Sequence, residues 1–406
     1  METILNLIKG QLGNNMDNKK TKMVTLLSLL AFMANGDNYA AAPLLIKISE
    51  DLGISLQSAA YSVTAYMLAF GAFTLIFGPL SDRFGKVRVI NIAAFGTAIF
   101  SILGGFAFNL QSLIIFRAFN GAFGAGIFPV TLALVGQSFN NKERQGALGK
   151  VMGTMFLGGA VATAIGGTIS YFGSWRMVYI IYGVGELIAA IIIMKTLERD
   201  KAVVSKFNLI SAYKVPFSNF RFMRLVTVIF FVGFTVFGSF TYSGKLIQQL
   251  TGYSVLQVGF ILSSFGLGTV LGGRIAPKMK SIIKKGYYVI AGIIGFTGLF
   301  ILSYSSNIVI LSFGLFIFGL AFISLQTSLL STAQAKLPKM AGTAMSLASF
   351  NMFVGGALGT AINGNLILKN GISSIYFNAS FIILIIGIIA EILILGFEMR
   401  QKQLKA

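Results

Sequence analysis

Four ionisable side chains lie within long apolar runs of this 406-residue sequence: Asp37, Arg117, Glu186 and Glu391. Ionisable groups at membrane depth are costly, and they commonly mark ion or substrate pathways. A carboxylate there can bind and release a proton, whereas an arginine keeps its charge and can hold a carboxylate in place. These residues are therefore the first candidates for chemistry.

A second concentration of charge is the turn Gly78 to Arg88, which reads GPLSDRFGKVR. Residues 59–77 before it carry no ionisable group except two tyrosine phenols, and residues 89–116 after it carry none. Each run is long enough to cross a bilayer, because about 20 apolar residues span ~30 Å of hydrocarbon. We therefore place this turn at a membrane surface.

The composition indicates an all-α membrane protein. Hydrophobic residues make up 55% of the chain and charged residues only 11%, too few to cover a water-soluble domain. Cys and His are absent, which excludes disulfides, thiolate or imidazole metal sites and histidine acid–base catalysis. We expect no metal, no cofactor and no enzyme activity.

Apolar runs bounded by Gly, Asn, Lys and Pro clusters predict twelve transmembrane helices. They lie near residues 23–46, 57–79, 89–107, 110–138, 145–172, 176–196, 222–247, 254–276, 287–304, 308–333, 342–367 and 374–397. Polar residues 1–22 are predicted to form a mobile tail, 197–221 a linker between two six-helix halves (23–196 and 222–397), and 398–406 a second tail.

The distribution of basic residues predicts the orientation. Of the 32 Lys and Arg residues, 27 fall in the tails and loops on one side of the predicted spans. Basic residues accumulate on the cytoplasmic side of membrane proteins. We therefore predict a multi-pass protein of the cell membrane whose termini, linker and charged turn lie on the cytoplasmic side. The net charge of +20 thus fits a membrane surface, and we expect no nucleic-acid partner.

The two halves resemble each other in sequence. Residues 156–167 (FLGGAVATAIGG) and 353–364 (FVGGALGTAING) agree at eight of twelve positions. Gly71, Thr74 and Gly78 recur as Gly266, Thr269 and Gly273. Close packing of helices through small residues could by itself favour such matches. In both matches, however, a helix of the first half corresponds in sequence to the helix six spans later, as a parallel repeat predicts.

The charged turn resembles the loop signature of the major facilitator superfamily, G-x-x-x-D-R/K-x-G-R/K-x-R/K. The matching residues are Gly78, Asp82, Arg83, Gly85, Lys86 and Arg88. The resemblance extends from about residue 23 to 397 and implies two six-helix bundles related by pseudo-twofold symmetry. It also implies that Asp82 latches the cytoplasmic side against helix 11, whereas the alternative is a solvated turn that only orients the protein.

Asp37 and Arg117 are predicted to face each other. They lie ~21 Å and ~10 Å from opposite ends of helices 1 and 4, so their depths in a ~30 Å core coincide. The resemblance places both in the central cavity, and Leu113, Arg117, Asn120 and Gly121 match the family's helix 4 pattern with Asn in place of Gln. It implies that Arg117 takes part in proton coupling, with Asp37 as the protonatable partner. A purely structural pair is the alternative.

Further residues of the predicted cavity come from helices 1, 4, 7 and 10. They are Asn35, Tyr39, Asn120, Phe128, Phe234, Phe237, Tyr242, Gln248 and Gln326. Aromatic rings and amides suit an apolar or cationic organic solute. Glu186 and Glu391 fall on helices 6 and 12, which the family places at the periphery. The structural interpretation is favoured for Glu391, and both interpretations stay open for Glu186.

Helix 5 carries part of the pattern G-x8-G-x3-G-P-x2-G-G found in proton-coupled exporters of this superfamily. Gly149, Gly158, Gly166 and Gly167 match, but Ala162 and Thr163 replace the central Gly-Pro. We expect these glycines to pack closely against a neighbouring helix. Loss of the proline removes a kink determinant and weakens the indication of export.

The sequence therefore predicts a secondary active transporter, with proton-coupled efflux of drug-like or small organic solutes as the leading function. No G-x-x-x-x-G-K-S/T phosphate loop is present, so we expect the ion gradient rather than ATP to supply the energy. The expected partners are a small-molecule substrate, protons and the lipid bilayer, and the carrier is expected to be a monomer. The alternatives are an importer or a lipid-linked sugar or metabolite carrier, and a non-transporting sensor or scaffold.

Overall fold

The computed structural model describes residues 2–139, 141–198, 200, 209–337 and 340–403, and this part of the chain is helical without strands. The helices are α1 (Glu2–Asp51), α2 (Leu56–Phe84), α3 (Lys86–Gly105), α4 (Leu110–Gly124), α5 (Phe128–Ser138), α6 (Asn141–Phe172), α7 (Trp175–Thr196), α8 (Leu209–Ser218), α9 (Phe220–Phe240), α10 (Ser243–Thr251), α11 (Val255–Ile283), α12 (Tyr287–Tyr304), α13 (Ile308–Lys336), α14 (Ala341–Asn370) and α15 (Ser373–Gln403).

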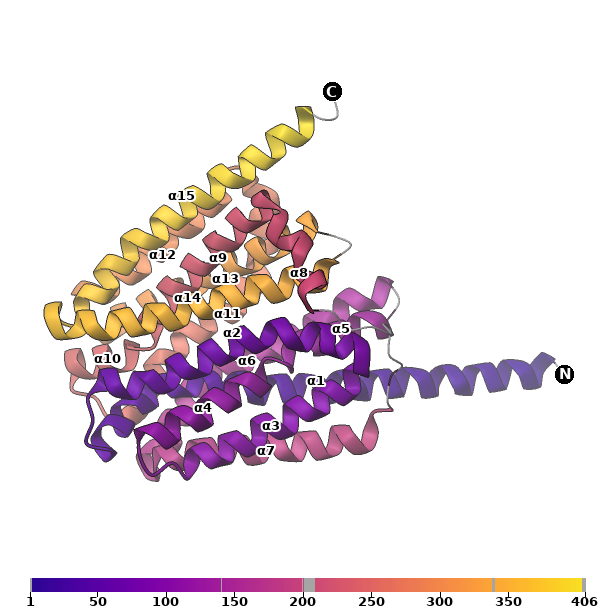
Figure 1. Ribbon diagram of the computed structural model, residues 1–406, viewed down its shortest axis with the longest axis horizontal. Helices are drawn as coiled ribbons and strands as arrows, with labels where there is room; N and C mark the ends of the chain where they lie inside the picture. The colour runs from indigo at the N-terminus through magenta and orange to yellow at the C-terminus, as the bar shows by residue number, and fades with distance from the viewer. Residues whose placement is uncertain (1, 140, 199, 201–208, 338–339, 404–406) are drawn as a thin grey trace.

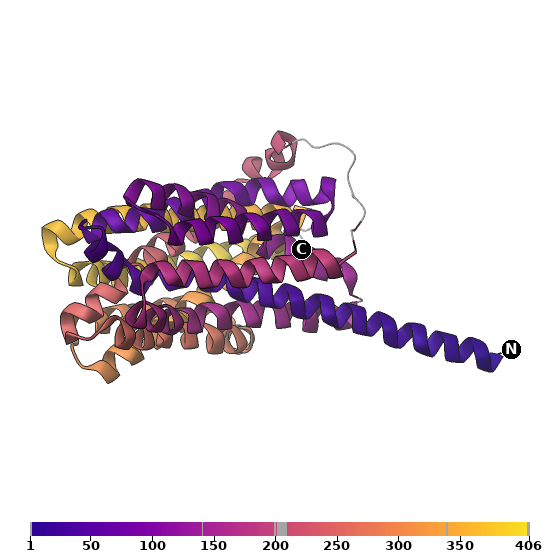
Figure 2. The ribbon, with the colours of Figure 1, turned by 90° about the horizontal axis from the view of Figure 1, so that it is seen from below.

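The helices form two bundles that lie side by side (Figure 1). In the first bundle α1 packs against α6, α3 against α7, and α2 against α4. In the second, α9 packs against α14, α11 against α13, and α12 against α15. The most extensive contacts between the bundles are those of α2 with α14 and of α6 with α11. The first helix starts and the last helix ends at the same end of the molecule, as Figures 1 and 2 show.

Eleven helical segments of the described chain are long and apolar enough to cross a membrane. They agree with the predicted spans from the second to the twelfth, and α1 supplies the first. The centre of the membrane-spanning part of α1 is less apolar than the other spans because it contains Asn35, Asp37 and Asn38. Two spans are each made of two helices, α4 with α5 and α9 with α10. The predicted all-α fold is confirmed.

Polar side chains on the connecting loops fix where several helices begin. Ser55 accepts a hydrogen bond from the Ser58 backbone N–H at 3.0 Å, and Asn109 forms a reciprocal capping box with Ser112. Such caps satisfy backbone N–H groups that lack a partner inside the helix. The turn between α2 and α3 instead requires a glycine, because Gly85 has a φ of +88° that side-chained residues rarely adopt.

The predicted tail and linker contain helix. Residues 2–22 of the predicted tail are helical and continue α1 beyond the bundle (Figure 2). Adding residues to an existing helix avoids the nucleation cost that a separate tail helix would carry. The linker contains α8, where the Tyr213 hydroxyl donates to the Leu75 carbonyl of α2 at 2.8 Å. Residues 199 and 201–208 of the linker lie outside the described chain.

The internal repeat is visible in the packing of the helices. A Cβ at Gly158 of α6 would overlap the Phe32 carbonyl of α1, and a Cβ at Gly355 of α14 would overlap the Phe230 carbonyl of α9. Each of these helices also contacts the other bundle, α6 through α11 and α14 through α2. The glycine-rich segments are therefore equivalent in structure as well as in sequence.

Candidate functional site

Asp37 and Arg117 form an ion pair in the centre of the first bundle. Arg117 Nη1 lies 3.3 Å from both carboxylate oxygens of Asp37, and the arginine and the aspartate are 0% and 1% exposed. The same nitrogen donates to Asn120 Oδ1 at 2.9 Å, and the Asn120 amide donates to the Thr97 carbonyl of α3 at 3.1 Å. The contact predicted from helix depth is present, and Asn120 orients the arginine.

Two tyrosine rings enclose the guanidinium. Arg117 Cζ lies 4.4 Å from the ring centre of Tyr66 on α2 and 5.0 Å from that of Tyr179 on α7. Ring faces stabilise a cation and exclude water, which strengthens the electrostatic interactions inside the cluster. Arg117 Nε and Nη2 have no hydrogen-bond acceptor among the described residues. The arginine therefore has donor capacity that the pair with Asp37 does not use.

The pair is buried inside the first bundle, and its predicted place on a substrate cavity stays a prediction. The cavity between the bundles measures about 20 Å³, and its lining includes Tyr39 and Phe240 but neither member of the pair. The partners of the pair all come from the first bundle, because Asn120 connects Arg117 to the Thr97 carbonyl of α3 and the enclosing rings belong to α2 and α7. A cavity of this size holds about one water molecule.

The remaining predicted cavity residues are dispersed. The Asn35 amide donates to the Met155 carbonyl of α6 at 2.9 Å, and Tyr39 packs edge-on against Phe240 with ring centres 5.8 Å apart. Gln326 of α13 lies near Met352 of α14, with its amide nitrogen 3.3 Å from the sulfur. Of the predicted cavity residues, Tyr39 and Phe237 line the small cavity between the bundles, and Phe234 lines a separate cavity among α9, α14 and α15.

Glu186 and Glu391 have different surroundings. Glu391 of α15 accepts hydrogen bonds from the backbone N–H groups of Gly286 at 2.6 Å and Tyr288 at 3.0 Å, so it caps the start of α12. Glu186 of α7 is 0% exposed, and neither carboxyl oxygen has a hydrogen-bond partner in the described chain. Asp37 and Arg117 lie close enough to interact with it electrostatically. Glu186 is thus a buried carboxyl close to the pair, on a helix that the family resemblance places at the periphery.

The charged turn brings together part of the predicted gate. Lys86 is 1% exposed and its Nζ lies 3.2 Å from Asp82 Oδ1. Arg83 and Arg88 lie over the ring of Phe84, at 5.0 and 5.9 Å from its centre. Gly78 packs against α14, where a Cβ would lie 3.1 Å from Ser346 Oγ.

Asp82 pairs with Lys86 in the described chain, and its implied latch to helix 11 stays a prediction because residues 338 and 339, just before α14, lie outside the described residues. Asp200 of the linker is a further acidic residue at this turn, and the sequence patterns did not indicate it. Its carboxylate accepts from the backbone N–H groups of Lys86 and Val87, both at 2.8 Å, and so occupies the start of α3. Gly85 makes room for it, because a Cβ there would lie 2.8 Å from the Asp200 carbonyl oxygen. The available signal was an acidic residue within a strongly basic linker.

Three of the four predicted helix 5 glycines lie at close contacts. Gly158 meets the backbone of α1, a Cβ at Gly166 would lie 3.2 Å from the Ala40 Cβ, and Gly167 meets Val255 and Gly259 of α11. Gly149 differs, because an added Cβ would find no atom within 4 Å. Packing therefore does not explain Gly149, which lies where α6 leaves the contact with α11.

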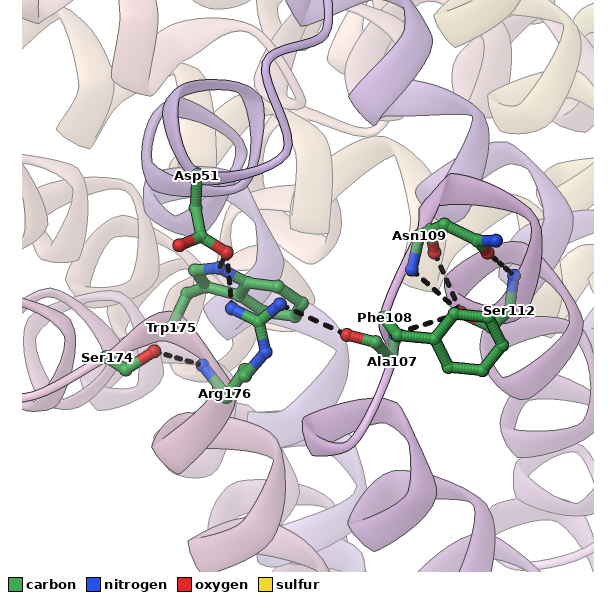
Figure 3. Close-up of polar contacts among 8 residues, drawn as sticks. All are labelled: Asp51, Ala107, Phe108, Asn109, Ser112, Ser174, Trp175 and Arg176. Atoms are coloured by element: carbon green, nitrogen blue, oxygen red, sulfur yellow. Dashed lines mark hydrogen bonds and ion pairs between the residues drawn. The ribbon is translucent and has the colours of Figure 1, made fainter.

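The end of the molecule opposite the termini is held by polar contacts (Figure 3). Arg176 of α7 donates to Asp51 of α1 and, through Nη2, to the Ala107 carbonyl at 3.1 Å. Trp175 Nε1 donates to the same Asp51 oxygen at 3.1 Å. The hydrogen bond from Arg176 holds the pKa of Asp51 below its usual range.

The two bundles are also in contact at this end. Gln57 of α2 donates to Asn365 of α14 at 2.7 Å, and a Cβ at Gly244 of α10 would lie 2.9 Å from the Ala42 carbonyl of α1. Toward the termini, added Cβ atoms at Gly149 and Gly153 of α6 would meet open space. Along α6, the two bundles therefore lie closer together at the end of the molecule that carries Asp51 than at the end that carries the termini.

Comparison with known proteins supports the same architecture. A profile described as Major Facilitator Superfamily matches residues 27–360. The chain is 22% identical to the Bacillus subtilis (strain 168) protein "Uncharacterized MFS-type transporter YceJ", covering 84% of this chain and 88% of the relative. It is 26% identical to "Multidrug transporter protein MdtP" of the same organism, covering 85% and 75%. The crystal structure of a mutant of the nucleoside transporter NupG superposes with a TM-score of 0.76 at 14% identity, covering 92% of this chain and 99% of that one.

Proposed function

The chain belongs to the Major Facilitator Superfamily, and from this premise we propose that it exports drug-like or other small organic solutes by proton-coupled alternating access. Membership makes it a multi-pass membrane transporter. Relatives at low identity include a multidrug transporter, which supports the proposed class of solute. The proposed carrier is a monomer with both termini in the cytoplasm, as its basic residues predict.

The observation that carries the proposal is the buried pair of Asp37 and Arg117. A proton on Asp37 would neutralise its carboxylate and break its pairing with Arg117 in a water-free environment. Breaking a buried pair costs about 3–5 kcal/mol unless another ionised group takes the place of the lost partner. An energy of this size is enough to change the relative populations of two conformations.

The proposed conformational change is a rocking of one bundle against the other. The contact between α6 and α11 is built from small residues, with Gly259 against Thr163 and Gly167. Such contacts allow helices to approach closely and to separate without removing large side chains. The small cavity beside Tyr39 and Phe240 would then widen to admit a solute. Asp82, which is half exposed here, would reach α14 in the opposite state.

The test is reconstitution into proteoliposomes with an imposed pH gradient, using ethidium as a fluorescent organic cation. We expect ethidium to move in the direction opposite to the protons. This gradient-driven movement should be lost in Asp37→Asn. Asp51→Asn serves as a control, because it removes a carboxylate from the same helix outside the buried cluster. Full proton coupling in Asp37→Asn would refute the assignment of Asp37. The absence of any gradient-dependent flux would refute the exporter.

A second candidate, a carrier of lipid-linked or other strongly apolar metabolites, is favoured by one observation. A cavity of about 480 Å³ lies among α9, α14 and α15, on the side of the second bundle. Its lining is mostly apolar, with Asn363 and Asn378 as amides. The size falls within the range of small-molecule sites. Transport of a fluorescent lipid analogue in the same proteoliposomes, without movement of ethidium, would favour this candidate.

A further inference from the structure

Glu186 is a buried acidic group that the proposed coupling mechanism leaves unused. It is 0% exposed on α7, and both of its carboxyl oxygens lack a hydrogen-bond partner in the described chain. An ionised carboxylate in that position would be desolvated without any compensating donor. A protonated carboxyl avoids this cost.

Contacts between α7 and α1 place Glu186 at the buried pair. A Cβ at Gly36 would lie 2.6 Å from the ring of Tyr182, and one at Gly185 would lie 3.2 Å from the sulfur of Met33. The part of α7 that carries Glu186 therefore lies along the part of α1 that carries Asp37.

The unused hydrogen-bonding groups of the cluster are complementary. Arg117 has two nitrogens, Nε and Nη2, without an acceptor among the described residues, and Glu186 has two oxygens without a donor. A guanidinium can bind carboxylates through different edges of its planar fork. The cluster thus holds one arginine, two carboxyl groups and free bonding capacity on both the arginine and the second carboxyl.

Charge neutrality limits the number of protons. The charged or titratable groups that act on Glu186 are Asp37 from α1, Arg117 from α4, Tyr66 from α2 and Tyr182 from α7. The described parts of α3 and α6 add no ionisable group to this set. With Arg117 positive and the tyrosines neutral, the cluster is neutral when the two carboxyl groups together hold one proton.

We propose that Asp37 and Glu186 share a single proton, and that Arg117 pairs with whichever of them is ionised. In the described state Arg117 pairs with Asp37, and Glu186 holds the proton. In the alternative state the O–H bond of Glu186 breaks, an O–H bond forms on Asp37, and the free edge of Arg117 binds the Glu186 carboxylate. The total charge does not change. Glu186 is then a second proton-binding residue of the transport cycle, and this role rests on the proposed proton coupling.

The test counts protonated carboxyl groups by infrared spectroscopy of the full-length protein in lipid nanodiscs at neutral pH. The infrared band of the carbonyl stretch of protonated carboxyl groups is recorded for each protein. It is compared with the spectrum of the double variant Asp37→Asn/Glu186→Gln, which lacks both carboxyl groups of the cluster. We expect a band of one carboxyl in the wild type and none in Glu186→Gln. We also expect none in Asp37→Asn, because Glu186 then ionises to pair with Arg117. Arg117→Met should double the band.

Two further variants make the result interpretable. Glu391→Gln should leave the band unchanged, because the Glu391 carboxylate accepts two backbone hydrogen bonds and is not part of the cluster. Glu186→Asp keeps a carboxyl group and should retain a band, which shows that the band does not depend on an undisturbed fold. A band that persists in Asp37→Asn would overturn the proposal, because the proton would belong to Glu186 alone. A wild type without a band would overturn it as well.

The infrared count does not depend on transport. If the band pattern appears but no proton-driven flux is found, the exporter is refuted and proton sharing stands. If flux and its dependence on Asp37 are found but the band persists in Asp37→Asn, the exporter stands and proton sharing is refuted.

Discussion

Removing the carboxylate of Asp200 should destabilise the first bundle by freeing the start of α3. In Asp200→Ala the backbone N–H groups of Lys86 and Val87 lose acceptors that lie 2.8 Å away. Loss of a helix N-cap costs about 0.5–2 kcal/mol, and loss of a negative charge at the positive end of a helix adds about 0.3–1 kcal/mol. From these two contributions we expect a loss of about 2 kcal/mol.

This loss can be followed through the one tryptophan of the chain. Trp175 is 2% exposed and starts α7, the helix against which α3 packs, so its fluorescence reports unfolding of the first bundle. For a unit of 150–250 residues, 1 kcal/mol shifts the melting temperature by about 2–4 °C. Thermal melts of the purified protein in detergent should therefore show a midpoint about 4–8 °C lower for Asp200→Ala.

The matched control is Glu198→Gln, two residues earlier in the linker. Glu198 is 87% exposed and pairs with Lys19, which is 76% exposed, at 3.1 Å. Exposed pairs contribute about 0–1 kcal/mol, so the midpoint should change little. Equal midpoints for Asp200→Ala and the wild type, or an equal decrease in the control, would contradict the proposed cap.

Two other predictions concern opposite ends of the first bundle. Because the hydrogen bond from Arg176 lowers the pKa of Asp51, this contact stabilises the fold above the unfolded-state pKa of about 3.9 and is lost as the pH falls through the folded-state value. Asp51→Asn should therefore lower the melting temperature at neutral pH, and the difference from the wild type should disappear in acid. Gly158→Ala should cost about 1–3 kcal/mol because its Cβ overlaps the backbone of α1 at Phe32, whereas Gly149→Ala should be neutral or slightly stabilising because its Cβ meets open space. Equal shifts of the melting temperature in the two glycine variants would contradict this explanation from packing.

The sequence predicted the fold well because membrane insertion depends on local properties. Run length and charge placement were sufficient for eleven spans, and the charged turn identified the family now matched over residues 27–360. The predicted depth of Asp37 and Arg117 was also sufficient to bring them together, since rise along a helix is constant. The roles of these residues in proton coupling remain predictions.

The surroundings of the pair were less predictable. Soluble helices reveal their buried face by its apolar character, but lipid is as apolar as a protein core, so the helices show no such difference between faces. For this reason the sequence could not tell that Asp37 turns into the first bundle, or that Glu186 joins it from α7. The sequence also could not show the open space at Gly149, because that space depends on where α6 separates from α11.

By itself, the sequence determined eleven of the twelve predicted spans and the position of the charged turn, because each depends on residues that are neighbours along the chain. The tertiary structure decided which polar groups meet. It brought Asp200 across the linker to the start of α3, and it placed one arginine among two carboxyl groups from different helices. These contacts depend on how each helix is rotated about its own axis, and that rotation is set only when all the helices pack together.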